Sequence, residues 1–291
     1  MRQAFRDATV ALMDKDERLV VLLGDIGVYA FSEGAKRHPN RLLNFGIMEQ
    51  SMVGFASGLA SAGFIPVLHS IAPFLVERAL EQIKVDFGYQ NLGGNLVSVG
   101  GSFDYAALGG THHSPGDVAA LLSVPGVEIF TPGHSDEVRD LVENHYLNDR
   151  VTYIRLSESS NSSTFLRGGE KIREVQGGNR GAVIVFGPLL DTVIDSAKNL
   201  DVSIIYTNCV HADVFRFAGE RNIGRLFIVE PFYERTTAPL VFESGFSFKS
   251  VKFAGFPRAF SHRYGTLREH VKDAGLDTAS LTEKLEHFFG A

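Results

Sequence analysis

Residues 44–64 read NFGIMEQSMVGFASGLASAGF, and this stretch decides the interpretation of the whole chain. Its spacing predicts a helix over 48–62 that opens with Glu49 and is otherwise built from unusually small residues. Glycines such as Gly54 and Gly58 each cost a helix about 1 kcal/mol relative to alanine. A helix that keeps both is expected to pack closely against another backbone, as at a subunit interface. From spacing alone, Glu49 has a second interpretation, a first-turn carboxylate that complements the helix dipole.

Short β-branched runs alternate with helical patterns on both sides of this helix. The first part of the chain predicts strands at 19–23, 64–68, 96–99, 127–130 and 151–156, with helices at 48–62, 73–87, 115–122 and 135–147. A polar, glycine-rich stretch at 157–181 is interpreted as a linker. Beyond it, strands are predicted at 182–186, 202–206, 226–229 and 250–253. The alternation predicts an α/β fold of two domains, 1–165 and 166–291, each a mostly parallel sheet flanked by helices.

The composition excludes several classes of function. The 291 residues carry a net charge of -6, so no basic surface for nucleic acid or an anionic membrane is indicated. No apolar run approaches the roughly 20 residues of a membrane span, and residues 1–19 predict a charged amphipathic helix instead of a signal peptide. The single cysteine, Cys209, cannot form an internal disulfide. A reducing, cytoplasmic location is therefore expected.

Ligand sites of open parallel sheets gather where strands end at their carboxyl termini. This rule singles out Asp25, His69 and the adjacent His112 and His113 of the segment GGTHHS. Asp25 could instead cap a turn, and His69 could be structural. Paired histidines could bind metal, but no nearby cysteine or acidic cluster supplies a full ligand set, so no metal site is predicted in this chain.

Five short motifs, taken in order, resemble the pyrimidine-binding domain of thiamine-diphosphate enzymes of the transketolase family. No single motif is specific, but their order along the chain is. They are Gly46-Ile47-Met48-Glu49-Gln50, Phe74 followed by Arg78-Ala79, Gly109-Gly110-Thr111-His112, Val124-Pro125-Gly126-Val127 and Thr131-Pro132. The resemblance implies a pyrimidine-binding domain followed by a transketolase C-terminal domain.

The resemblance also assigns roles toward the cofactor. Glu49 matches the family's catalytic acid, which hydrogen-bonds N1′ of the cofactor pyrimidine and promotes the tautomer that removes the thiazolium C2 proton. Phe74 matches the aromatic residue that stacks on the pyrimidine. Arg78 and Asp25 are expected beside the cofactor. These assignments come from the family and not from residue spacing.

On the substrate side, His112 matches a catalytic histidine that contacts substrate oxygens in transketolases, and His113 and His69 are expected nearby. Other positions depart from the family. Glu158 stands where conventional transketolases have a phosphate-binding arginine, Leu108 replaces an acidic residue and Gly100 replaces a histidine. Arg155 is close, but alternation along its strand directs it to the opposite face from Leu156. An atypical or unphosphorylated sugar is therefore expected.

One half of the family's active site is absent from the sequence. The chain contains no Gly-Asp-Gly motif, and its two Gly-Asp pairs, Gly24-Asp25 and Gly116-Asp117, are followed by isoleucine and valine. The resemblance therefore implies a split enzyme, in which a second polypeptide, the partner subunit, holds the diphosphate through Mg²⁺ and shares thiamine diphosphate with this chain. An α2β2 assembly follows by family analogy. The second domain is expected to serve assembly, with no catalytic role.

The resemblance predicts a β-type transketolase subunit that helps transfer a two-carbon ketol unit from a ketose to an aldehyde. One alternative is the β subunit of a 2-oxo-acid dehydrogenase, or of an acyloin or 1-deoxyketose synthase. A third hypothesis is a non-catalytic structural subunit, against which the presence of both Glu49 and Phe74 argues.

Overall fold

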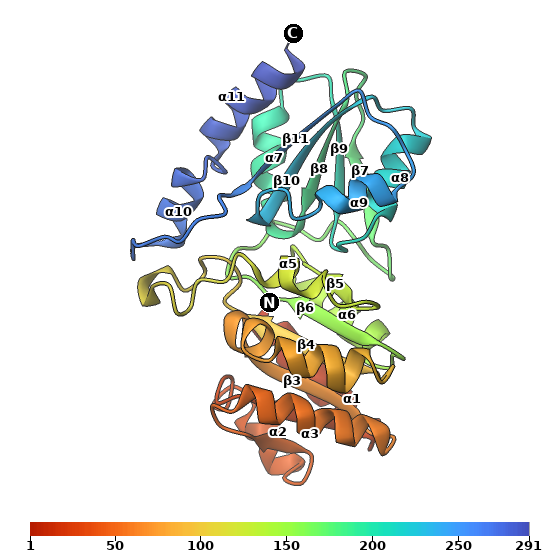
Figure 1. The fold of residues 1–291 in the computed structure, drawn as a ribbon, viewed down its shortest axis with the longest axis vertical. Helices are drawn as coiled ribbons and strands as arrows, with labels where there is room; N and C mark the ends of the chain where they lie inside the picture. Colours follow the sequence, from red (N-terminus) through yellow and green to blue (C-terminus); the bar gives the residue numbers. More distant parts are fainter. Residues whose placement is uncertain (291) are drawn as a thin grey trace.

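The computed structural model describes residues 1–290 and contains two α/β domains stacked along the long axis of the molecule (Figure 1). This confirms the predicted fold class. The first sheet is parallel throughout, with the strand order β2-β1-β3-β4-β6-β5. Its strands are β1 Leu19–Leu23, β2 Leu42–Asn44, β3 Ile65–Ile71, β4 Gly94–Val99, β5 Glu128–Phe130 and β6 Val151–Arg155.

Most strands of the first domain were predicted to within a few residues because their buried, β-branched runs are unambiguous. The exception is β2, a three-residue strand at the edge of the sheet, which is too short to produce a pattern. The six-residue helix α2 Ser32–Arg37, which contacts β2, was missed for the same reason.

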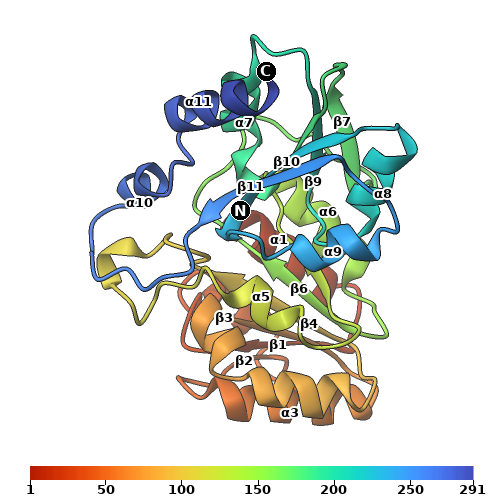
Figure 2. The same cartoon turned by 45° about the horizontal axis from the view of Figure 1, so that its top comes forward.

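Helices cover both faces of the first sheet. On one face lie α1 Arg2–Met13 and α6 Ser135–His145, which pack against each other. The other face carries α3 Glu49–Ser61 and α5 Asp117–Leu121. Figures 1 and 2 show α3 on the outer surface of this domain, far from the second domain.

The single helix predicted at 73–87 is wrong. The segment consists of two wide π-helical turns and a short α-helical turn, η1 Pro73–Glu77, α4 Leu80–Gln82 and η2 Ile83–Gly88. Such wide turns are frequent at functional sites because they shift side chains out of the regular helical register. The periodicity of apolar residues does not reveal them.

The second sheet has the order β11-β10-β8-β9-β7, and only β7 is antiparallel to its neighbour. Its strands are β7 Ile172–Gln176, β8 Ala182–Phe186, β9 Ser203–Thr207, β10 Arg225–Tyr233 and β11 Ser250–Phe256. The accompanying helices are η4 Gly187–Leu189, α7 Leu190–Ala197, α8 Asp213–Glu220, α9 Ala238–Glu243, α10 Leu267–Asp273 and α11 Thr278–Phe289. Because β7 lies inside the predicted linker 157–181, that linker is shorter than expected. Its charged, half-exposed sequence gave no strand signal. A boundary near residue 165 stays a proposal.

The second domain covers the free edge of the first sheet. At that edge, β5 is joined in antiparallel fashion to residues 208–210 of the second domain. The Thr131 amide donates to the Asn208 carbonyl at 2.7 Å, and the Val210 amide donates to the Ile129 carbonyl at 2.9 Å. The two domains therefore share main-chain hydrogen bonds in addition to side-chain contacts.

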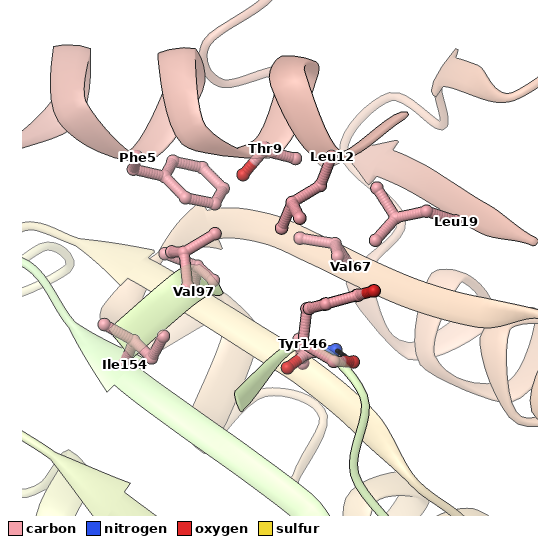
Figure 3. A pocket seen from close by; sticks show the side chains of 10 residues that line it. Phe5, Thr9, Leu12, Leu19, Val67, Val97, Tyr146 and Ile154 are labelled. Carbon is pink, nitrogen blue, oxygen red and sulfur yellow. Dashed lines mark hydrogen bonds between the residues drawn. The ribbon is translucent and has the colours of Figure 1, made fainter. Parts of the chain in front are cut away.

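One pocket lies beneath α1, where Phe5, Thr9 and Leu12 face Val67 and Val97 of the sheet (Figure 3). Its internal space is ≈ 10 Å³, which suits about one water molecule and no metabolite. The Thr9 hydroxyl has no protein partner among the described residues and would bind such a water. Within residues 1–290, no helix is both long and apolar enough to cross a membrane.

Candidate functional site

The side chain of Glu49, the first residue of α3, is fully buried and has two hydrogen-bond donors. The Ser70 hydroxyl donates to Oε1 at 2.8 Å, and Arg78 Nη1 donates to Oε2 at 2.6 Å. Ser70 lies near the end of β3, and Arg78 follows η1 directly. The π-helical turn and the strand end thus hold one buried carboxylate at the carboxyl edge of the sheet.

Gly24, which directly follows β1, leaves the space that this carboxylate occupies. A Cβ atom at Gly24 would lie 2.9 Å from Ser70 Oγ and 3.2 Å from Glu49 Oε1. A larger residue would therefore displace the carboxylate or its serine partner. The next residue, Asp25, has a positive φ of 58° and pairs with Asn44 at the end of β2 through two hydrogen bonds. Asp25 lies on the exposed rim of the site instead of its floor.

Phe74 and His112 extend the site beyond the carboxylate. The guanidinium carbon of Arg78 lies 4.2 Å from the centre of the Phe74 ring, and the His112 ring meets that ring edge-on at 5.1 Å. Glu49, Ser70, Phe74, Arg78 and His112 therefore form a contiguous group, hereafter the Glu49 cluster. Partial burial, followed by the neighbouring His113, lowers the pKa of His112, so its ring is neutral near pH 7.

The Glu49 cluster fits the pyrimidine half of thiamine diphosphate. The planar guanidinium of Arg78 lies over the Phe74 ring while an N–H group of the same plane donates to Glu49. A flat, nitrogen-containing ring that stacks on Phe74 and hydrogen-bonds Glu49 would make the same two contacts. The side chain of Arg78 is 38% exposed, which leaves it room to move aside.

A metal ion has no comparable group of side chains among the described residues. Within residues 1–290, no group of three or more histidine, cysteine, aspartate or glutamate side chains is arranged to hold a metal ion. The groups that the Glu49 cluster offers to a cofactor are therefore one buried carboxyl group and one aromatic face.

Two of the predicted substrate-binding histidines are not brought into the cluster. His69 lies on the opposite face of β3 from Ser70, packs against Phe5, and donates from Nδ1 to the Val97 carbonyl at 2.7 Å. Burial lowers its pKa to about 4. His113 turns toward the second domain, where its ring contacts Phe103 and His270. The structure gives both histidines packing contacts, and their contact with substrate stays a prediction.

Two positions that depart from the family, Leu108 and Glu158, lie in or against the loop that carries His112. Leu108 is half exposed on the loop that carries His112. The amide of Glu158 donates to the buried carboxylate of Asp104 at 3.1 Å, and burial raises the pKa of Asp104 to about 6. Asp104 and Ser70 were missed as candidate residues, and the buried Arg155 was considered but set aside because of the face of the strand it occupies. Strand alternation does place Ser70 and Arg155 on the α3 face, but their depth of burial has no sequence signal.

These features define a class: an α/β domain with a buried acid and a half-buried aromatic residue at the carboxyl edge of a parallel sheet, followed by a smaller α/β domain. The chain belongs to the transketolase pyrimidine-binding-domain family, whose description, "Transketolase, pyrimidine binding domain", it matches over residues 1–162. This is more than half of the 291 residues and places the chain in a family of thiamine-diphosphate enzymes.

Three similar proteins extend the comparison. An uncharacterised 33.6 kDa protein in the fasciation locus of Rhodococcoides fascians is 36% identical and covers 100% of this chain and 95% of its own. One of the subunits of the apulose-4-phosphate transketolase of Actinobacillus succinogenes is 32% identical over 58% of this chain and 58% of its own length. A solved split-gene transketolase, described as an inactive beta4 tetramer, superposes with a TM-score of 0.85 at 21% identity and covers 99% of this chain and 98% of its own. This structural likeness shows the shared fold.

Proposed function

We propose that this chain is the β-type subunit of a split transketolase that uses thiamine diphosphate to move a two-carbon ketol unit from a ketose to an aldehyde. The observation that carries the proposal is the placement of the Arg78 guanidinium between Phe74 and Glu49. The guanidinium occupies the space between an aromatic face and a buried carboxylate, where the pyrimidine ring would bind.

Each residue of the cluster has a defined task in this proposal. Glu49 holds a proton between its carboxyl group and N1′ of the pyrimidine, and Ser70 fixes the orientation of that carboxyl group. Phe74 supplies the stacking surface once Arg78 has swung outward. The bound cofactor supplies a carbon nucleophile at C2. The neutral His112, at the edge of Phe74, is the group on this chain best placed to hydrogen-bond substrate oxygens. Asp25 would contact the cofactor from the rim.

The diphosphate and its Mg²⁺ are assigned to a partner subunit. The outer surface of α3 supports this assignment because it presents apolar and small residues to solvent. Met48, directly before the helix, and Phe55 are 55% and 47% exposed, and a Cβ atom at Gly58 would meet nothing within 4 Å. An exposed apolar surface of this kind is typical of an interface. With two copies of each subunit the assembly would be α2β2, in a cytoplasmic setting.

The substrate is proposed to be an atypical sugar. The similar protein from Actinobacillus succinogenes is named for apulose 4-phosphate. Glu158 would repel a phosphate at the position of the usual arginine, so any anionic group must be bound elsewhere in the site.

The test is calorimetric titration of thiamine diphosphate with Mg²⁺ into the chain alone and into its co-purified pair, followed by a screen of ketose donors. Tight binding that needs the pair, with turnover that needs no lipoyl group or electron acceptor, is expected. Tight binding by the chain alone would contradict the shared site. Turnover of a 2-oxo acid with an electron acceptor would favour the dehydrogenase alternative.

A further inference from the structure

The loop that carries His112 is closed at its base by a pair of serines. Ser102 and Ser114 form an antiparallel bridge, in which each amide donates to the other's carbonyl at 3.0 and 2.8 Å. The residues between them, 103–113, contain the short turn η3 Ala106–Leu108 and present His112 to Phe74. The position of His112 therefore depends on this two-serine base, hereafter the loop neck.

A buried arginine holds the loop neck from the sheet side. Arg155, the last residue of β6, is only 3% exposed, and its Nη2 donates to Ser102 Oγ at 2.7 Å and to the Ser114 carbonyl at 3.3 Å. Its Nε donates to Asp117 Oδ2 at 2.7 Å, and the Tyr153 hydroxyl donates to the same oxygen at 2.7 Å. One guanidinium thus joins both strands of the neck to a buried acid.

The backbone at Gly101 is shaped to receive this guanidinium. A Cβ atom at Gly101 would lie 2.5 Å from Arg155 Cζ, so a side chain there would push the guanidinium away from the neck. On the other side of the neck, Ser114 Oγ donates to Glu77 Oε1 at 3.0 Å. Glu77 is the last residue of η1, the same turn that carries Phe74. The neck is therefore connected to the turn that carries Phe74 as well as to the loop that carries His112.

The second domain is attached to the same neck. The pairing of β10 with β11 shifts register between Val229 and Tyr233, which frees main-chain groups of β10 from the sheet. The freed Pro231 carbonyl accepts from Ser102 Oγ at 2.5 Å and from Arg155 Nη1 at 3.4 Å. The Tyr233 amide donates to the Pro115 carbonyl at 2.9 Å.

Further along the same loop, the Phe103 ring stacks on His270 at 4.2 Å, nearly parallel. A Cβ atom at Gly109 would lie 2.6 Å from the Tyr264 ring, which records how closely the two segments approach. In Figures 1 and 2 the loop and the segment before α10 lie side by side. The second domain thus contacts the loop at its neck and near its tip.

We infer that Arg155 is a positioning residue that fixes the His112 loop in its working conformation and fastens it to the second domain through the loop neck. The second domain then has a task beyond assembly, because it supplies the Pro231 carbonyl and the His270 ring that hold the loop. The importance of this for ketol transfer rests on the proposed function. The positioning itself is a property of this chain and can be measured without the partner.

The test compares Arg155→Lys and Ser102→Ala with a matched control, Arg150→Lys, an exposed arginine just before the same strand. Lysine keeps the charge but cannot reach Asp117 and both strands of the neck at once. Ser102→Ala removes the hydroxyl that accepts from Arg155 and donates to the Pro231 carbonyl, without leaving a buried charge unpaired, so it serves if Arg155→Lys does not fold. Hydrogen–deuterium exchange is measured on the full-length chain.

Amides of residues 103–113 are expected to exchange about 10- to 100-fold faster in both variants, as befits the loss of a hydrogen bond to a charged group, with the core strands unchanged. In the reconstituted pair, kcat/KM should fall while affinity for thiamine diphosphate is retained. Unchanged exchange at 103–113, or faster exchange across the whole chain, would overturn the inference. If the loop exchanges faster in the variants but the reconstituted pair shows no ketose turnover, only the proposed function is contradicted.

Discussion

The Glu49 carboxylate and the Arg78 guanidinium lie 2.6 Å apart, with the carboxylate fully buried and the guanidinium reaching solvent over the ring of Phe74. Removing the arginine leaves a buried charge whose remaining donor is Ser70. We predict that Arg78→Met lowers the free energy of unfolding by about 2 kcal/mol, a moderate value because the arginine is partly exposed. Urea denaturation of the lone chain measures this. The double variant Arg78→Met/Glu49→Gln should recover part of the loss, since it removes the unpaired charge.

Replacing Glu49 tests its proposed role as the acid that shares a proton with N1′ of the cofactor. Glu49→Gln keeps the size of the side chain but cannot exchange a proton with N1′, so ketose turnover by the pair should fall by about 100-fold or more. Glu81→Gln, an exposed position on α4, is the control and should leave turnover intact. Full activity in the Glu49 variant would favour the hypothesis of a structural subunit.

Phe74 is expected to contribute mainly to cofactor affinity. Phe74→Leu keeps an apolar side chain but loses the aromatic face, so the Kd of thiamine diphosphate in the pair should rise about 3- to 10-fold. Titration calorimetry provides the measurement. The same substitution at Phe260, which is 87% exposed, should have no effect on the Kd.

The exposed surface of α3 leads to a prediction about assembly with the partner subunit. Gly58→Leu places a side chain where the isolated chain has open space, and loss of a helical glycine favours the helix. The lone chain should keep its stability or gain up to about 1 kcal/mol, whereas the complex with the partner should no longer form. Size-exclusion chromatography with light scattering reports the assembly, and Glu143→Leu on α6 is the control. A complex that forms normally would place the partner on another surface.

His69 gives the fold a pH dependence with a defined sign. Its pKa is lowered to about 4 in the folded state because of burial, against about 6.5 when unfolded. Between these values the unfolded chain binds the extra proton, so stability is complete above pH 6.5 and is lost as the pH falls toward 4. The contribution of His69 should fall by about 2 kcal/mol between pH 7 and pH 5.

The comparison that isolates this contribution uses His69→Phe, which fills the space beside Phe5 and cannot titrate. Urea denaturation at pH 7 and pH 5 should show a smaller difference for this variant than for the natural chain. His262→Gln, an exposed position, should retain the full difference. An unchanged pH dependence in His69→Phe would mean that other groups dominate.

The parts of the fold that have a local residue pattern could be predicted from the sequence. Buried strands such as 19–23 and the small-residue helix after Glu49 were predictable because burial on both sheet faces selects β-branched runs and helical periodicity selects spacing. The π-helical turns at Pro73–Glu77 and the charged edge strand Ile172–Gln176 were not, since neither has a period of its own.

The candidate site was predictable only in part. Motif order identified Glu49, Phe74 and His112, which the structure brings together. It could not reveal that Ser70 faces the carboxylate while the adjacent His69 faces Phe5, because the choice of face depends on which helices cover the sheet. Arg155 was correctly placed on the opposite face from Leu156, but its bonds to Ser102 and Ser114 arise from long-range packing.

The hydrogen bonds between β5 and residues 208–210 have a consequence for attempts to divide the chain. A fragment ending at residue 165 would lose the Asn208 carbonyl and the Val210 amide, and the Thr131 amide and the Ile129 carbonyl at this edge would be left without partners. Such an edge pairs readily with strands from other molecules. The isolated first domain is therefore expected to aggregate. The second domain would then be needed to keep the first domain in solution, whether or not it is needed for ligand binding.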